Sequence, residues 1–318
     1  MAAHGMADPP DDLVLPFHLS ASRMSGRILR LGRVVDTILT RHDYPEPVCH
    51  ALGDALALTG MIATALRFDS KDGDGRFILQ TRTDGPIGLI VVHYDAPGRL
   101  RGYASHTLGD DAPTGRGDQA ALLGSGNLAM TIDPGGDLDR YQGIVPLDRE
   151  ELVSAAQSYF RQSEQLPTFI RLALARIFVN GAWSWRAGGL MLQHIPREGG
   201  TAPPGETPEE HDERLEGDFD ENWQRVRFLA ETVEDHELLD PTLAPERLLF
   251  RLFHEEGVRV TDALPLSAEC RCSRERILSF LTRFGAEELS DMRQADGSIS
   301  VTCEFCSTKY SFEPGSIT

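Results

Sequence analysis

Four of the five cysteines lie in two close pairs near the C-terminal end of the chain. One residue separates the cysteines of the first pair, two separate those of the second, and thirty residues lie between the pairs. A short gap lets two sulfurs point at one centre, and two such pairs supply the four thiolates of a tetrahedral zinc site. We therefore expect one Zn²⁺ per chain, with the ligands Cys270, Cys272, Cys303 and Cys306.

The chain around these cysteines has the signals of a small zinc ribbon. Ser273 can cap a helix over residues 274–284, and residues 300–302 and 310–312 can form the arms of a hairpin around the second pair. The 49 residues from Cys270 to the end would gain only about 3–5 kcal/mol from their own core, whereas a structural zinc contributes roughly 10–16 kcal/mol. We expect this module to unfold without its metal.

The same cysteines could form either an inert structural clip or a redox switch. Zinc binds thiolates, and the nearby cations Arg271, Arg274 and Arg276 favour that ionised form. An oxidant that reaches the sulfurs would convert them to disulfides and expel the metal. Inert sites are the commoner kind, but the one-residue gap of the first pair is shorter than the usual spacing of roughly two to four residues. Spacing alone leaves both interpretations open.

Composition argues against several other classes of protein. The formal net charge of -18 would repel polyphosphate backbones and anionic lipid surfaces, which disfavours nucleic-acid and membrane partners. The first twenty residues lack the basic start and the apolar stretch of a secretory signal. The most apolar run, residues 48–66, is interrupted by His50 and Asp54, which favours a buried helix over a membrane span. We expect a soluble cytoplasmic protein.

The first 196 residues mix helical and strand patterns, which predicts an α+β fold. Apolar residues recur at three- and four-residue steps over residues 22–39, and a second helix is expected over residues 47–66. Between residues 76 and 103 the period changes, and turn sequences break the apolar runs into strands. Further strands are expected at 128–132, 141–145 and 168–179, and a helix at 148–160. We assign residues 1–196 to one large N-terminal α+β domain.

Composition changes abruptly after Pro196. Residues 197–240 hold fifteen Asp or Glu against four Arg, and they begin with a proline- and glycine-rich stretch. Two amphipathic helices are expected next, the second between Pro245 and Gly257, and their apolar faces would become adhesive if released. The first has the apolar positions Phe219, Trp223, Val226, Ala230 and Val233. We assign residues 197–265 to an acidic insertion and helical linker, and 266–318 to a zinc-binding redox-switch domain.

Three other features are assigned ordinary structural roles. Residues 124–129 match a dinucleotide-binding fingerprint, but a strand is expected where that fingerprint needs a helix, so we predict a turn. The sequence at 254–257, HEEG, lacks the second histidine of a metalloprotease helix and is interpreted as a helix end. Cys49 lies in the predicted buried helix and is interpreted as a small core residue without a redox role.

Several segments together carry a likeness to a known family. Residues 270–276 read CRCSRER, and residues 301–306 read VTCEFC. The other segments are 101–104, 159–160, 163–168, 187–193 and 251–256. The chain resembles the redox-regulated chaperones named heat-shock protein 33, and the likeness covers nearly all of it after about Leu13.

The resemblance implies an ATP-independent holdase that is inactive when reduced and zinc-bound. Oxidative and heat stress would activate it through disulfides between Cys303 and Cys306 and between Cys270 and Cys272, with zinc release, linker unfolding and dimerisation. Unfolded or partly unfolded client proteins would be its partners. The helices that contain Trp223 and Phe253 are the segments expected to melt. No residue need catalyse a reaction, so the chain is not expected to be an enzyme.

Two other functions remain as alternatives. A thiol-disulfide oxidoreductase would also use Cys303 and Cys306, but it normally places such a pair at a helix start and needs no second pair. A zinc-ribbon nucleic-acid-binding module would need a basic face, which the overall acidity opposes. Relative to the family pattern, residues 197–212 resemble an insertion and the first dozen residues an extension, which bears on linker length and not on the metal site.

Overall fold

The computed structural model describes most of the 318 residues. The described residues are 11–66, 68, 75–109, 111–136, 138–179, 181–194, 221–313, 316 and 317. The predicted insertion at 197–212 and the linker residue Phe219 lie outside them.

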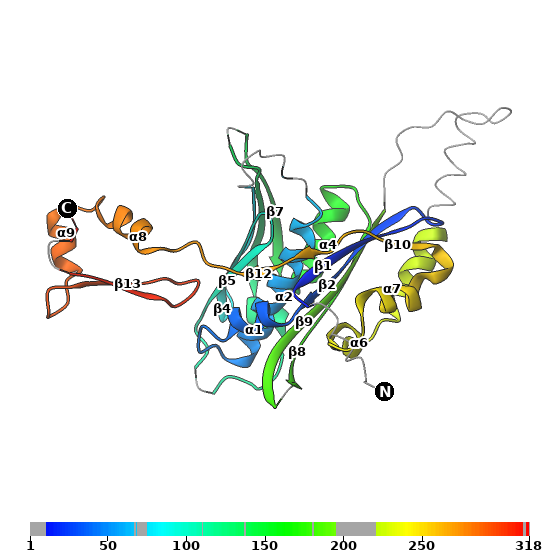
Figure 1. Ribbon diagram of the computed structural model, residues 1–318, viewed down its shortest axis with the longest axis horizontal. Helices are drawn as coiled ribbons and strands as arrows, with labels where there is room; N and C mark the ends of the chain where they lie inside the picture. The colour runs from blue at the N-terminus through cyan, green and yellow to red at the C-terminus, as the bar shows by residue number, and fades with distance from the viewer. Residues whose placement is uncertain are drawn as a thin grey trace, which may run out of the picture.

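Two six-stranded sheets form the body of the protein (Figure 1). The first sheet contains β1 (Leu13–Leu19), β2 (Met24–Leu31), β8 (Thr168–Val179), β9 (Ala182–His194), β10 (Val258–Val260) and β11 (Leu264–Pro265). The second contains β3 (Arg76–Thr83), β4 (Ile87–Asp95), β5 (Arg99–His106), β6 (Ser125–Asp133), β7 (Tyr141–Asp148) and β12 (Ser267–Ala268). The first sheet has the order β10-β1-β2-β9-β8 with β11 beside β1, and the second has the order β12-β5-β4-β3-β6-β7. β12 runs parallel to β5, and the other pairs are antiparallel.

Helix α2 (Glu46–Ala63) lies between the two sheets and forms the centre of the main core (Figure 1). It is buried on nearly all sides, which is the pattern of a helix enclosed by protein. Gly53 is needed for this close packing, because a Cβ there would lie 2.5 Å from a methyl carbon of Leu174. The predicted helix over 47–66 is thus confirmed. Among the helices in the described part of the chain, none has the length and apolarity to cross a membrane.

The strands predicted at 76–103, 128–132, 141–145 and 168–179 are confirmed as β3 to β8. Three shorter helices accompany them: α1 (Arg33–Leu39), α3 (Gln119–Leu123) and α4 (Leu152–Gln162). α4 corresponds to the helix predicted over 148–160 and packs against β7 and β8. The prediction of a turn over 124–129 is wrong for most of these residues, because Gly124 ends α3 and Ser125–Asp133 form β6. A strand, not a helix, follows the first glycine, so the dinucleotide fingerprint lacks the helix that it needs.

The prediction of one helix over residues 22–39 is wrong. Met24–Leu31 form strand β2, and within 22–39 the helical residues are Arg33–Leu39 of α1. β2 lies between β1 and β9 and is buried on both faces, with Met24 in one core cluster and Leu29 in the other. A strand buried on both faces lacks a simple polar and apolar alternation, so its apolar spacing imitates that of a helix.

Helices from residues 221–256 cover the face of the first sheet that points away from α2 (Figure 1). They are the helix at residues 221–231, α6 (Asp235–Leu239), α7 (Pro245–Phe253) and the 3-10 turn η1 (His254–Glu256). We call residues 221–256 the covering segment. Its side chains share a core cluster with the sheet: Val226, Ala230, Val233, Leu238, Leu239, Leu248, Leu249, Leu252 and Phe253. Both predicted linker helices are confirmed over the described residues, and HEEG is a helix end as predicted, because Gly257 stops the turn with a φ of 67°.

The chain then crosses the body and ends in a small module. Residues 258–268 form β10, β11 and β12, which pair with strands of both sheets. We call residues 269–313, 316 and 317 the cysteine module. It holds α8 (Arg274–Leu281), α9 (Ala286–Asp291) and the hairpin of β13 (Ile299–Thr302) and β14 (Lys309–Phe312), and it lies at the opposite end of the molecule from α7 (Figure 1). The predicted α+β class with a C-terminal four-cysteine module is confirmed.

Candidate metal centre

The two cysteine pairs come from different elements of the cysteine module. Cys270 and Cys272 lie between β12 and α8, and Cys303 and Cys306 lie in the turn of the β13–β14 hairpin. All four sulfurs lie within 4.8 Å of one another. The Sγ atoms of Cys270 and Cys303 are 3.7 Å apart, and those of Cys272 and Cys306 are 3.3 Å apart. The four residues selected by spacing therefore meet at one centre as free, partly buried thiols.

Local hydrogen bonds hold each pair in place. In the hairpin turn the N–H of Cys303 donates to the carbonyl of Thr308 at 3.0 Å, and the N–H of Ser307 donates to the carbonyl of Cys303 at 2.8 Å. Ser307 has a left-handed φ of 55°, which lets the turn close. Beside the first pair, the Ser273 side chain accepts a hydrogen bond from the N–H of Arg276, so α8 begins at Arg274 as predicted, although it ends at Leu281 rather than at residue 284.

The donor set and its spacing fit a tetrahedral metal. Zinc–sulfur bonds of about 2.3 Å place the sulfurs of a regular tetrahedron about 3.8 Å apart. The Cys272–Cys306 and Cys270–Cys303 separations, at 3.3 and 3.7 Å, are close to that value. Four sulfur ligands select thiophilic metals and exclude magnesium and calcium, which prefer oxygen. The cluster could therefore hold one metal ion of the zinc type.

The surroundings affect the four thiols unequally. Burial raises the pKa of Cys272 to about 12, and it also raises the pKa of Cys303. At Cys306 burial acts in the same direction, but hydrogen bonds with Thr308 and the neighbouring thiols outweigh it and lower the pKa to about 7. A thiolate at Cys306 opposes ionisation of its neighbours, and a bound divalent cation would remove that repulsion. The electrostatics therefore also suit a cation at the centre.

Two hydroxyl groups that the sequence analysis did not identify contact the sulfurs. Tyr310 Oη donates to Cys272 Sγ at 3.3 Å, and Thr308 Oγ1 lies 3.2 Å from Cys306 Sγ. The hydrogen bond with Cys272 raises the pKa of Tyr310 to about 12. Both hydroxyls follow Cys306 within four residues, so the predicted hairpin was the signal that could have identified them.

The arginines beside the first pair are engaged away from the sulfurs. Arg274 donates to the carbonyl of Ser311 at 2.7 Å, and Arg276 donates to the carbonyl of Arg271 at 2.8 Å. A cation from the body lies nearer to the sulfurs: Nη1 of Arg101 on β5 is 4.0 Å from Cys270 Sγ. Since 169 positions separate the two residues, no spacing in the sequence indicates this contact.

Cys49 differs from the four clustered cysteines in its burial and its surroundings. It is buried in α2, and its thiol lies 3.7 Å from the carbonyl of Tyr44. Burial raises the pKa of Cys49 to about 12, so it is a poor nucleophile at neutral pH. These observations agree with the prediction of a small core residue.

Comparisons with known proteins identify relatives over almost the whole chain. Residues 12–313 match a family model described as Hsp33 protein. The 33 kDa chaperonin of Caulobacter vibrioides (strain NA1000 / CB15N) is 42% identical over 308 residues, which cover 96% of this chain and 95% of that protein. The 33 kDa chaperonin of Ectopseudomonas mendocina is 35% identical over 311 residues, covering 96% and 94%. The crystal structure of the 33 kDa chaperonin of Thermotoga maritima, a heat shock protein 33 homolog, has a TM-score of 0.73 at 22% identity and covers 97% of both chains.

These relatives define the class of the protein as a chaperone, which binds client proteins. The chain belongs to the Hsp33 family. The family resemblance seen in the sequence is confirmed, and the likeness to the solved structure confirms its fold.

Proposed function

We propose that this chaperone is a redox-regulated, ATP-independent holdase. In the reduced state, zinc held by the four cysteines keeps it inactive. Oxidation of those cysteines releases the zinc, loosens the covering segment and exposes surface that binds unfolding proteins. The observation that carries the proposal is the gathering of four free thiols within 4.8 Å of one another in a module with a very small apolar core.

The size of that core makes the module dependent on its cysteines. Its buried apolar side chains are Leu281, Ile299 and Phe312. A core of three residues leaves little net stability, whereas a zinc site of this kind contributes roughly 10–16 kcal/mol. Loss of the four thiolates would therefore unfold the module.

Disulfide formation is the reaction that removes those thiolates. Two thiolates give two electrons to one peroxide, which takes up two protons and leaves as two waters, and a sulfur–sulfur bond forms. Disulfide sulfurs lack the charge with which thiolates bind a metal. The family resemblance implies the pairs Cys303–Cys306 and Cys270–Cys272, whereas the reduced cluster also brings Cys270 within 3.7 Å of Cys303 and Cys272 within 3.3 Å of Cys306. Peptide mapping of the oxidised chain would distinguish the two patterns.

The covering segment conceals the apolar surface that the active state would expose. Phe253 is fully buried, and its ring stacks on Phe17 of β1 with centroids 5.7 Å apart. The buried guanidinium of Arg30 on β2 holds the end of α6 and the loop after it, donating to the carbonyls of Glu237 at 3.0 Å and Leu243 at 2.9 Å. Release of this segment would uncover a continuous apolar sheet face, the kind of patch that binds other proteins.

Residues 258–268 link the module to the covering segment. They pair with β1 and with β5, so they tie the C-terminal end of the covering segment to the body. Melting of the module would remove the folded module that adjoins these short pairings and would so weaken the C-terminal end of the covering segment. The oxidised chain would dimerise through its exposed surface and act in the cytoplasm on clients unfolded by heat or oxidants, with no catalysed reaction.

Light scattering of a heat-aggregating client tests this proposal without ATP. We expect the oxidised protein to suppress scattering, the reduced protein to have no effect, and re-reduction with zinc to restore inactivity. C49A is the matched control, because Cys49 is a buried thiol outside the cluster, and it should behave as the wild type does. Suppression by the reduced and oxidised forms alike would contradict redox control, and insulin reduction by the chain would favour an oxidoreductase.

A further inference from the structure

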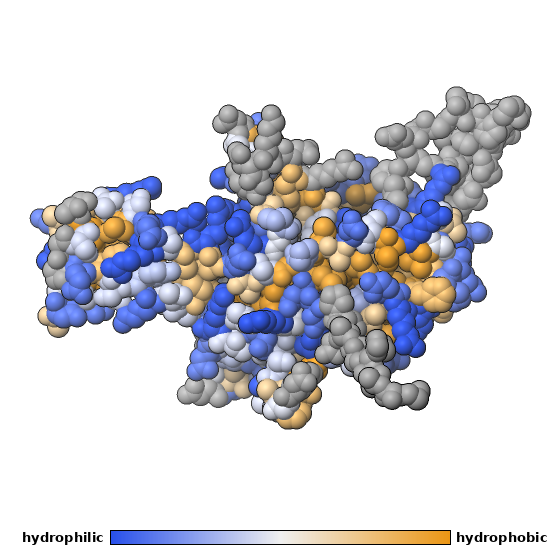
Figure 2. Space-filling model, viewed as in Figure 1, coloured by the Kyte–Doolittle hydropathy of each residue, from blue (hydrophilic) through white to orange (hydrophobic). Residues whose placement is uncertain are grey.

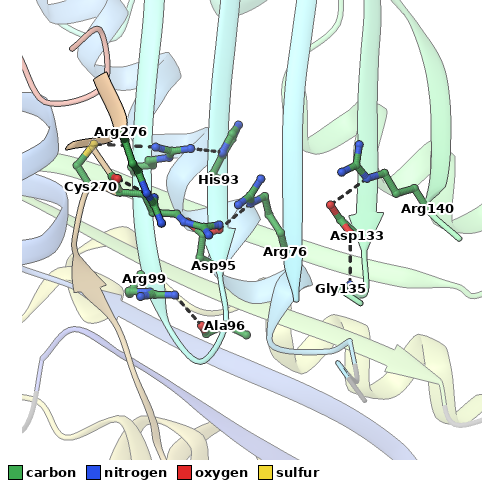
Figure 3. A network of polar contacts seen from close by, with 12 residues as sticks. Arg76, His93, Asp95, Ala96, Arg99, Asp133, Gly135, Arg140, Cys270 and Arg276 are labelled. Carbon is green, nitrogen blue, oxygen red and sulfur yellow. Dashed lines mark hydrogen bonds and ion pairs between the residues drawn. The ribbon is translucent and has the colours of Figure 1, made fainter. Parts of the chain in front are cut away.

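Between the two cysteines of each pair lies one residue whose side chain contacts the two-sheet body of the protein. Arg271, between Cys270 and Cys272, places Nη1 2.9 Å from Oδ1 of Asp95 at the end of β4. The Asp95 side chain is 2% exposed and also pairs with Arg76 at 2.6 Å (Figure 3). This ion pair is therefore shielded from water, where such pairs are stronger than on the surface.

The second pair has an anchor of a different kind. Phe305, between Cys303 and Cys306, lies with its ring centroid 4.3 Å from the guanidinium carbon of Arg101 and 5.1 Å from the His93 ring. Arg101 Nη2 lies 2.9 Å from Nδ1 of His93, which orients the guanidinium on the sheet. The contact is a cation stacked on an aromatic face.

Arg101 joins both halves of the cluster. It stacks on the residue inside the second pair, and its Nη1 lies 4.0 Å from the sulfur of Cys270 in the first pair. Hydrophilic and apolar residues lie side by side on the surface where the module joins the body (Figure 2). The module thus contacts the body through the same two short loops that carry its sulfurs.

We propose that Asp95 and Arg101 are positioning residues of the four-cysteine centre, each holding the residue inside one cysteine pair so that docking of the module and the reduced state of the cysteines stabilise each other. The regulatory role of this linkage rests on the proposed function. The coupling between docking of the module and oxidation of its cysteines does not depend on that function. The body is then part of the redox sensor, and its residues set the potential at which the cysteines oxidise.

The linkage follows from the size of the loops. A disulfide requires a sulfur–sulfur distance of about 2.05 Å, which is shorter than the contacts across the reduced cluster, 3.7 Å between Cys270 and Cys303 and 3.3 Å between Cys272 and Cys306. The sulfurs must therefore leave their places around the common centre when a disulfide closes. Closing a disulfide at either pair moves the ends of a loop that has only one or two residues inside it, so Arg271 or Phe305 must leave its position on the body. Each disulfide forms as two thiols give up two electrons and two protons to an oxidised glutathione, which becomes two molecules of reduced glutathione. By reciprocity, docking that favours the reduced loops raises their reduction potential.

The test compares R101A and D95N with R99A in the full-length, zinc-loaded protein. R99A is the matched control, because Arg99 lies two residues from Arg101 on β5 and its side chain bonds to the carbonyl of Ala96 rather than to the module. The first readout is hydrogen exchange of residues 303–308 in the reduced state. The second is the midpoint potential of the cysteines in glutathione buffers at a fixed zinc concentration.

We expect faster exchange at residues 303–308 in R101A and D95N and wild-type exchange in R99A. If R101A weakens docking about tenfold, the midpoint potential falls by about 30 mV, since that is the shift per factor of ten for a two-electron couple. R101K keeps the cation and should recover part of the shift. In a double-mutant cycle, R101A should add little to F305A, because both remove the same contact.

Potentials and exchange in R101A and D95N equal to those of R99A would overturn the linkage, as would full additivity of R101A with F305A. If D95N fails to fold because Asp95 is buried, R101A alone decides the question. Failure of the proposed function would be seen in a different assay, because the oxidised wild type would then not suppress client aggregation. Neither hydrogen exchange nor the midpoint potential depends on that result.

Discussion

Truncation of Phe253 should activate the chaperone without oxidation. The ring is fully buried between α7 and the first sheet and stacks on Phe17 at 5.7 Å. Replacing a buried Phe by Ala costs about 3–5 kcal/mol. The contact exists only while the covering segment is docked, so this loss falls on the docked state. At about 1.4 kcal/mol per factor of ten, even 3 kcal/mol raises the population of the undocked segment roughly a hundredfold.

The assay is suppression of client aggregation by reduced F253A whose zinc content equals that of the wild type. We expect suppression without oxidant, together with faster hydrogen exchange over residues 221–256. F250A is the matched control, because Phe250 lies on the same helix with 63% of its side chain exposed, and it should remain inactive when reduced. Fast exchange in F253A without any suppression would refute the idea that the covering segment conceals the client-binding surface, and activation by F250A would show that the effect is not specific.

Three further predictions concern the cluster, the covering segment and the core. C303S removes one of the four predicted ligands, so bound zinc should fall from about one per chain to near zero and the module should lose its exchange protection, and full zinc content would contradict the assignment. R30A leaves the carbonyls of Glu237 and Leu243 without their buried donor, at roughly 1–3 kcal/mol each, so hydrogen exchange of residues 237–243 should accelerate in the reduced protein, and unchanged protection would show that other contacts fix this loop. Burial raises the pKa of Asp54 from 3.8 to about 6 in spite of its ion pair with Arg116, so the native state binds this proton more tightly than the unfolded chain does. Stability should therefore fall, on the order of 3 kcal/mol, as pH rises from about 4 to about 6, and D54N should flatten that dependence in urea titrations, while an unaltered pH profile would contradict it.

The cysteine cluster was predictable because its information is local. Two short gaps placed each pair of sulfurs together, and the helix and hairpin signals beside them indicated a common centre. Tyr310 and Thr308 could have been found by following the hairpin register a few residues further. The covering helices were predictable for a similar reason, because each has one apolar side that returns every three or four residues.

The interior of the first sheet was less predictable. β2 is buried on both faces, so burial removed the alternation that marks a half-exposed strand and left a spacing that suits a helix equally well. Arg101 and Asp95 could not be identified from the sequence at all. Each lies on the second sheet, 169 positions from Cys270 and 176 from Arg271 respectively, and only the folded sheet edge brings them to the module. The division of the chain at residues 196 and 265 stays a prediction.

Zinc release measured together with chaperone activity tests the central claim most directly. The reduced protein is treated with peroxide at elevated temperature, free zinc is followed with a metallochromic dye, and samples are assayed for suppression of client aggregation without ATP. We expect the loss of about one zinc per chain, with suppression appearing as the zinc leaves. Retention of the zinc, or its release with no gain in suppression, would show that the four cysteines form an inert clip and that the activity resides elsewhere.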